Sequence, residues 1–389
     1  MLRFYFFALI CSFAWNSFAA ESLQSSIHRS YQSPRALGMG GAFVAVANDY
    51  SAIFYNPAGL ARREDGQINL SMELGFSPSY FTFANDVKDV AGVNGTEADK
   101  FKSFSDFLLD QYGKQFSLRA GLFEAFWVRP NWGIAIIPAD LSIDIQILNQ
   151  AAPAMDIRTY LDTTIAYSYA NYLKGYVDGI LTYGVTAKFV NRGFASKQLN
   201  SWDLVADSTF FKQSDLRDGY TIDADLGVLY TPDLPSDGIF SLLNLAKPTF
   251  GMTVRNVLDY GFTNSFRLFN KKEVEAPEKL HRVVDLGTKW EYPSLWIFQG
   301  RGVMDFTDIM HPSYNFRKGL HIGFEFDWTV ASWWKGQYRV GLNQGFVTAG
   351  VSALFALFNL DLVTYGEDIG TNKNPQENRM YLLKMNVDI

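Results

Sequence analysis

The feature that most constrains this chain is a period-two alternation of apolar and polar residues, repeated from residue 67 to the C-terminus. Residues 320–328 show it: the apolar face holds Leu320, Ile322, Phe324, Phe326 and Trp328, and the other holds His321, Gly323, Glu325 and Asp327. Side chains of a β-strand project alternately to opposite sides, so each segment predicts a strand with one apolar and one charged face.

Soluble sheets also alternate, but three further features favour a membrane barrel. Charged residues recur in the middle of the polar face, many segments reach ten residues, and aromatic residues such as Trp127, Trp290 and Trp328 lie toward segment ends. Transmembrane strands of roughly 9–11 residues carry apolar residues outward, polar residues inward and aromatic belts at both interfaces. The sequence therefore predicts an all-β, antiparallel transmembrane barrel.

The alternation places 14 strands, an even number as bacterial barrels require. We expect them at residues 66–76, 78–84, 116–129, 131–147, 157–172, 177–193, 218–231, 248–257, 281–292, 295–305, 318–330, 336–345, 347–365 and 378–389. The long loops are then 85–115, 191–217, 260–279 and 366–378, with a short amphipathic helix at 101–112 and an apolar helix or cover within 231–247.

The first residues predict a secretory signal peptide. Arg3 precedes an apolar core at residues 4–15, and Ala19 and Ala20 supply small residues for cleavage. We therefore divide the chain into a signal peptide at 1–19, an N-terminal arm and plug at 20–65, and a barrel at 66–389. The only cysteine, Cys11, falls in the signal peptide, which leaves no disulfide, thiolate metal site or cysteine nucleophile in the mature chain.

Charge and motifs exclude several functions. The net charge is −6 and the basic residues are scattered, so nucleic acid is not an expected partner. Hydrolase, metalloprotease and phosphate-loop motifs are absent from the sequence. His321 and Glu325 share a face, but four residues of strand put them about 13 Å apart, too far for a catalytic dyad. We expect no enzyme, no metal and no cofactor.

Residues 33–61, SPRALGMGGAFVAVANDYSAIFYNPAGLA, break the alternation with four glycines and two prolines. This stretch closely resembles the N-terminal signature of FadL-type outer-membrane transport proteins, in which such a run forms a plug inside a 14-stranded barrel. The later stretch from Gln337 to Gly370 is more similar to the PorV-like branch. The resemblance assigns the plug, or gate, to Gly38, Gly40, Gly41, Asp49, Asn56, Pro57, Ala58 and Gly59.

The resemblance implies passive uptake of long-chain fatty acids or other hydrophobic compounds across the outer membrane of a Gram-negative bacterium, gated by the N-terminal plug. The compound would pass when residues 33–61 shift or through a gap in the barrel wall. The PorV-like branch implies instead a scaffold for protein secretion or surface attachment, with a secreted or surface protein as partner. The sequence leaves both open, as it leaves open whether the plug moves.

The glycines and Pro57 explain how the plug backbone could fold compactly inside a barrel. Gly38, Gly40 and Gly41 permit positive φ and close backbone approach, and Pro57 holds Asn56 out of helical geometry. Buried backbone groups in a plug need partners on the barrel wall. Candidate lumen charges are Arg255, Lys289, Glu325 and Arg339. Lys384 also faces inward, as do seven further carboxylates, Asp144, Asp223, Asp225, Asp285, Glu291, Asp327 and Asp361.

Overall fold

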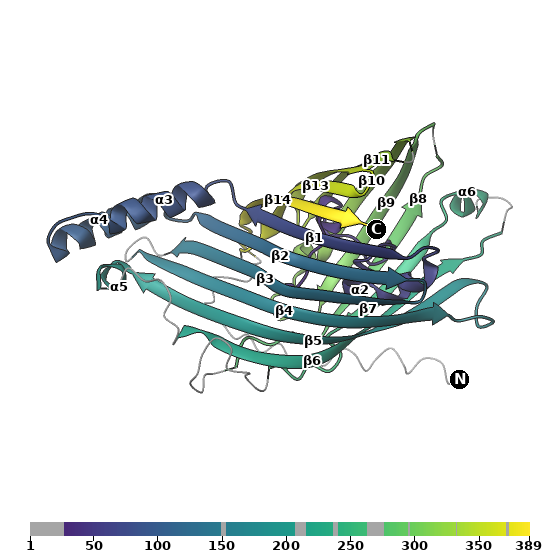
Figure 1. Cartoon of the computed structure of the whole chain (residues 1–389), viewed down its shortest axis with the longest axis horizontal. Coiled ribbons are helices and arrows are strands. Elements are labelled where there is room, and N and C mark those ends of the chain that lie inside the picture. The colour runs from purple at the N-terminus through teal and green to yellow at the C-terminus, as the bar shows by residue number, and fades with distance from the viewer. Residues whose placement is uncertain are drawn as a thin grey trace.

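The chain forms one closed antiparallel barrel of 14 strands, in which β1 closes the ring against β14 (Figure 1). The computed structural model describes residues 27–148, 153–206, 215–235, 240–262, 276–294, 296–331, 333–370 and 373–389. The expected signal peptide lies outside these residues. The predicted fold class, a transmembrane β-barrel of 14 strands, is confirmed.

The 14 strands follow one another along the chain from residue 67 to residue 388. Their bounds are β1 Gln67–Phe76, β2 Gln115–Arg129, β3 Trp132–Leu148, β4 Ala154–Tyr172, β5 Gly179–Asn200, β6 Arg217–Pro232, β7 Thr249–Arg255, β8 Val283–Glu291, β9 Phe298–Ile309, β10 Leu320–Ala331, β11 Trp334–Asn343, β12 Phe346–Phe355, β13 Phe358–Asp368 and β14 Glu377–Asp388.

Short helices lie inside and at the ends of this barrel. They are α1 Pro34–Gly38, α2 Ala52–Tyr55, the 3-10 helix η1 Pro57–Arg62, α3 Tyr80–Ala91, α4 Glu97–Asp110, α5 Ser201–Ala206, α6 Phe240–Leu245 and α7 Phe316–Gly319. Helices α3, α4 and α5 stand at one end, called the loop end below, and α6 stands at the opposite end, called the turn end. No helix among the described residues is long and apolar enough to span a membrane.

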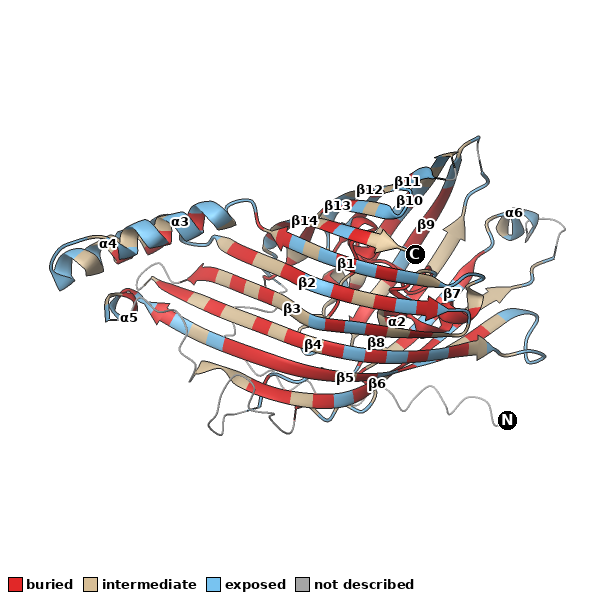
Figure 2. Cartoon of the chain, in the orientation of Figure 1, coloured by how far each residue is buried: buried red, intermediate tan, exposed pale blue. Residues whose placement is uncertain are grey.

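The alternation of the sequence becomes an outer and an inner face. Met72, Leu226 and Phe324 are exposed on the outer wall, whereas Asp225 and Glu325 are buried inside it. Figure 2 shows this as exposed and buried bands along the strands. The outer face therefore presents apolar side chains to lipid, and the polar face turns inward as predicted.

Two strand assignments were wrong, and their errors cancel in the count. Residues 78–84 begin helix α3, because Tyr80, Phe83 and Val87 are spaced for one helical face and pack against Phe116 of β2. Residues 347–365 are two strands, β12 and β13, joined by a turn in which Ala356 has φ 57°. Alanine rarely takes this conformation and no Gly or Asn marks the turn, so the turn has no signal in the sequence.

One predicted loop was also too long. Residues 191–200 continue β5 in register with β4 to the pair of Ala154 and Asn200. The predicted helix near residues 101–112 is confirmed as α4, which begins earlier because Thr96 and Asp99 form a capping box.

Candidate functional site

Residues 27–62, called the interior segment below, lie within the barrel. Helix α1 packs on β11, β12 and β13, while η1 packs on β4, β5 and β6 across the ring. Met39, Phe43 and Leu60 are fully buried there. The barrel is thus filled by chain that contacts strands on opposite sides.

Glycines of the barrel wall form the seat of the interior segment. A Cβ added to Gly184 of β5 would lie 2.4 Å from the Ala58 nitrogen, and one added to Gly323 of β10 would lie 2.3 Å from the Met39 carbonyl oxygen. The wall glycines in such contact with the segment are Gly184, Gly227, Gly251, Gly287, Gly323, Gly341 and Gly350. A side chain at these inward positions would occupy space that the segment fills, with its backbone at most of them and with the side chains of Asn56 and Val44 at Gly227 and Gly287.

Asn56 joins two parts of the segment to the wall. Its side-chain Nδ2 donates to the Val44 carbonyl oxygen at 3.0 Å and to the Val228 carbonyl oxygen of β6 at 3.1 Å. Its Oδ1 accepts from the Ala58 N–H and so caps η1, which Pro57 opens. Gly59 lies so close to Ala47 that an added Cβ would fall 1.7 Å from the Ala47 oxygen.

The glycine-rich run uses positive φ at two of its three positions. Gly40 and Gly41 have φ of 69° and 84°, and the Gly41 side of this turn rests on His321. His321 Nδ1 is paired with the Gly40 carbonyl oxygen at 2.6 Å. Gly38 instead lies in α1, without positive φ, and its role is close approach to Arg339 and Gly350.

Two of the predicted lumen charges, Glu325 and Arg339, meet at the interior segment. Glu325 accepts from Arg35 at 2.7 and 2.8 Å and from Arg339 at 3.0 Å, and it is fully buried. Arg35 also binds Asp49 at 2.9 Å. Burial alone would lower the pKa of Arg35, but Glu325 and Asp49 raise it well above its ordinary value. This charged cluster fixes α1 to β10 and β11.

Two other predicted lumen charges, Arg255 and Lys289, do not contact the segment in the same way. Arg255 binds Asp285 at 2.5 Å and Asp308 at 2.5 Å, and only Asp308 continues the network to Arg29 of the segment. Lys289 pairs with Glu291 on its own strand, near the turn end. Inward charges can therefore be predicted from the sequence, but not which of them reach the segment.

Two further wall residues contact the segment: Asp305, which is not named among the candidate lumen charges, and Lys384, which is. Asp305 of β9 accepts from the backbone N–H groups of Phe43 and Val44 at 2.6 and 2.7 Å. The Lys384 ammonium lies 5.3 Å from the centre of the Tyr31 ring and 5.8 Å from that of Tyr50. Burial raises the pKa of both tyrosines, so each remains a neutral phenol.

His28 and Arg29, at the start of the described segment, bind the wall near the loop end. The His28 ring stacks on Tyr160 at 3.9 Å and contacts Asp162 at 3.2 Å. Burial lowers the pKa of His28, although its hydrogen bond to Asp162 raises it. A single histidine in an arm gives no periodic signal, so the sequence could not single it out.

The hydrogen-bond pairing of strands β1 to β4 is irregular at one height of the barrel wall. Pairing of β2 with β3 stops at Gly121 with Asp140 and resumes at Ala125 with Ile136. The β1–β2 register shifts by one residue beside this gap, and so does the β3–β4 register. Pro138, which has no N–H to donate, lies in the unpaired stretch. Backbone pairing is thus lost in one patch of wall, called the wall gap below.

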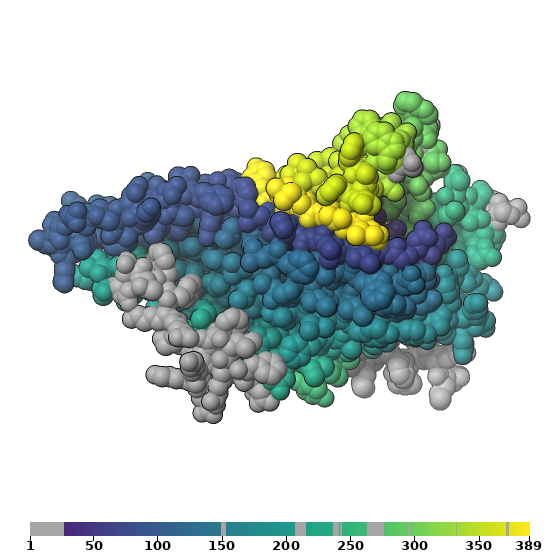
Figure 3. All heavy atoms as spheres, viewed as in Figure 1, coloured from purple at the N-terminus to yellow at the C-terminus, as the bar shows by residue number. Residues whose placement is uncertain are grey.

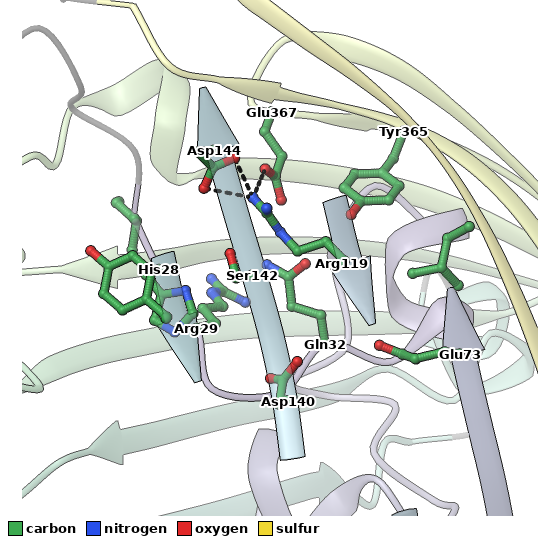
Figure 4. A pocket seen from close by; sticks show the side chains of 13 residues that line it. His28, Arg29, Gln32, Glu73, Arg119, Asp140, Ser142, Asp144, Tyr365 and Glu367 are labelled. Carbon is green, nitrogen blue, oxygen red and sulfur yellow. Dashed lines mark hydrogen bonds and ion pairs between the residues drawn. The ribbon is translucent and has the colours of Figure 1, made fainter. Parts of the chain in front are cut away.

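A small polar pocket lies inside the barrel between the interior segment and β1 to β4, β13 and β14 (Figure 4). Its volume is about 40 Å³, and its lining includes Gln32 of the segment, Arg119 of β2 and Tyr365 of β13. Asp140, at the edge of the wall gap, also faces it. The pocket and the wall gap therefore share a residue.

An apolar cluster covers the loop end above β2 to β5. Phe83 and Val87 of α3, Phe104 and Leu108 of α4, and Leu204 of α5 are buried together there. Figure 3 shows α3 and α4 projecting from the barrel at this end. Phe101 and Trp202 stack at 4.3 Å, and Trp202 is 58% exposed. The loop end thus offers an exposed aromatic surface.

The two residues weighed as a catalytic pair have separate partners. His321 is held by Gly40 and Glu325 by three arginines, Arg35, Arg301 and Arg339. Within the described residues, no group of three or more His, Cys, Asp or Glu side chains is arranged to hold a metal ion.

No family model and no curated protein matches this chain. Solved structures that it is similar to include the CymD monoaromatic hydrocarbon channel, at 10% identity and TM-score 0.45, covering 91% of this chain and 96% of that one. The toluene transporter TbuX of Ralstonia pickettii has 10% identity, TM-score 0.45 and coverages of 92% and 98%. A FadL homologue of Pseudomonas aeruginosa has 9% identity, TM-score 0.32 and coverages of 94% and 99%.

Proposed function

We propose that this protein is an outer-membrane channel of a Gram-negative bacterium for passive uptake of hydrophobic compounds, with no enzymatic step. The compound docks on the aromatic surface of the loop end, enters the barrel and leaves sideways through the wall gap. The single observation that carries this proposal is the wall gap, because it breaks the ladder next to a lumen pocket.

The contacts of the interior segment support a fixed stopper rather than a gate. For the segment to move, it would have to lose its contacts with seven wall glycines, the hydrogen bond of Asn56 to Val228 and the ion pairs of Glu325. Truncating one partner of a buried ion pair typically costs 3–5 kcal/mol, so displacement of the whole segment is expensive. A lumen closed along its axis leaves the wall as the route.

The apolar loop end supports the first step. Phe81, Leu109 and Trp202 are 51%, 42% and 58% exposed on α3, α4 and α5. An oily ligand that covers them would gain roughly 25 cal/mol for each Å² of apolar surface removed from water.

Crosslinking across the wall gap tests the route. Leu122 and Ala139 lie opposite each other in the unpaired stretch if the flanking register is continued, and a cysteine at each would join β2 to β3. Oxidation should lower uptake of a labelled hydrophobic compound into cells, and a reductant should restore it. The matched control places cysteines at Trp127 and Ile134, which pair in register outside the gap. Full uptake through a barrel whose crosslink is complete by mass spectrometry would contradict the lateral route.

The secretion-scaffold alternative makes a different prediction, a partner protein that co-purifies with the barrel. No contact among the described residues specifically favours it. Cells with and without the protein that take up the labelled compound equally would remove the channel proposal and leave the scaffold standing.

A further inference from the structure

The polar pocket beside the wall gap contains buried hydrogen-bonding groups without partners. The Tyr365 hydroxyl and the Ser142 hydroxyl have no hydrogen bond to any described residue, although these side chains are 0% and 1% exposed. Buried polar groups are nearly always paired, because an unpaired one loses its water without compensation. Two such groups aimed at one cavity indicate that a ligand group completes them.

The carboxylate of Asp140 is the third open group. Asp140 and Ser142 stand two residues apart on the same face of β3 and both project into the pocket (Figure 4). The Asp140 carboxylate makes no hydrogen bond or ion pair with any described residue, whereas Asp144 and Glu367 bind Arg119 at 2.9 and 3.6 Å. Asp140 is therefore an available acceptor.

The cations that line the pocket are already committed. Arg119 is held by Asp144 and Glu367, and Arg29 is held by Asp308. Glu73, on the β1 side, adds a further carboxylate, 3.5 Å from Lys384. An anionic head group would thus meet an unpaired carboxylate and find no uncommitted arginine.

We propose that this pocket takes the hydroxyl head of a neutral amphiphile, such as a long-chain alcohol, and discriminates against a carboxylate head. A hydroxyl group donates one hydrogen bond and accepts others, so it can donate to Asp140 while it accepts from Ser142 or Tyr365. The volume also fits: about 40 Å³ is several times the roughly 10–15 Å³ that one water needs. This inference rests on the proposed function and specifies which hydrophobic compounds the channel prefers.

The adjacent wall gap explains how such a ligand is arranged. Its head would occupy the pocket at Asp140 while its hydrocarbon tail passes between β2 and β3 toward Leu122 and Ile136, which are exposed on the lipid-facing side. The head pocket then holds the ligand at the point where it leaves the barrel.

The test compares binding of 1-dodecanol, dodecanoate and dodecane to the full purified protein in detergent at pH 8, where dodecanoate is ionised. The intact protein should bind dodecanol about tenfold more tightly than dodecanoate, since an ionised carboxylate has no proton to donate to the open acceptor of Asp140. Asp140→Asn should narrow this ratio to about threefold or less, chiefly because dodecanoate binds better. The control Glu291→Gln, at the turn end, should leave the ratio unchanged.

Tyr365→Phe provides a second variant that removes only one hydroxyl. It should weaken dodecanol binding about fivefold and leave dodecane binding as it is, because the alkane makes no hydrogen bond. Each variant must first show the heat-dependent gel shift of a folded barrel.

The outcomes separate this inference from the proposed function. Equal binding of dodecanol and dodecanoate, or an unchanged ratio in folded Asp140→Asn, overturns the hydroxyl-head pocket while uptake stays intact. If none of the three compounds binds and cells take up none of them, the channel itself fails.

Discussion

Replacing Gly184 by alanine tests how the interior segment is held. The new Cβ would lie 2.4 Å from both the Ala58 nitrogen and the Pro57 carbonyl carbon, whereas ordinary contacts of a Cβ lie at 3.4 Å or more. Because the obstructing atoms are backbone, η1 must move away from β5 by about 1 Å or the strand must bend. Such overpacking typically costs about 1–3 kcal/mol.

This cost falls on the seated state and so shifts the equilibrium toward a displaced segment. A loss of about 1–3 kcal/mol corresponds to roughly a 5- to 150-fold larger displaced population. Trypsin reports it at Arg35, whose side chain is 13% exposed in the seated segment. When opening is fast relative to cleavage, the cleavage rate at Arg35 should rise by the same factor.

Gly75→Ala is the matched control, because its added Cβ would meet nothing closer than 3.4 Å. This variant should be cleaved at Arg35 at the rate of the unmodified protein. If Gly184→Ala forms a folded barrel by the gel-shift criterion and is also cleaved at the unmodified rate, then the glycines do not seat the segment and the reasoning is refuted.

Two further predictions concern the same segment. Asn56→Ala removes the hydrogen-bond partner of the Val44 and Val228 carbonyl groups and of the Ala58 N–H. It should therefore destabilise the seated segment by about 2–3 kcal/mol and speed cleavage at Arg35 in the same assay. Unchanged cleavage would contradict the role of Asn56. Burial lowers the pKa of His28, so around and below about pH 6.5 the seated arm binds fewer protons than the released arm, and acid favours release. The protection factor of amides near His28, which corrects the exchange rate for the intrinsic rate at each pH, should therefore fall as the pH is lowered from 7.5 toward 5.5. His28→Asn should remove that dependence.

The barrel could be predicted from the sequence because one physical rule governs every strand. A strand residue faces either lipid or the interior, so the side that Leu226 or Asp225 faces can be predicted from its polarity alone, without knowing its neighbours. No comparable rule predicts which residues contact each other across the lumen. Glu325 and Arg35 are 290 positions apart, and only the closed ring brings them together.

The seat of the interior segment has a signal in the sequence, in the glycines of the strands. Gly184, Gly227 and Gly323 fall on the polar side of their strands, where a barrel lumen would accept larger polar residues. Glycine weakens a strand, so its repetition at inward positions signals close approach of another backbone. The sequence could therefore have predicted contact between wall and plug, although not which residues meet.

The wall gap has a signal of the same kind. Ile134 and Ile136 face outward at even positions, but beyond Pro138 the outward positions of the strand, Leu141 and Ile143, are odd. When the outward positions of a strand change from even to odd while its apolar side still faces outward, the strand must contain a bulge of one residue. Pro138 also removes a ladder hydrogen bond at the same place. That change of phase is also what turns Asp140 and Ser142 inward. The exit through the wall and the group that we propose to select its ligand thus depend on the same insertion in β3, so removing the bulge should abolish both together.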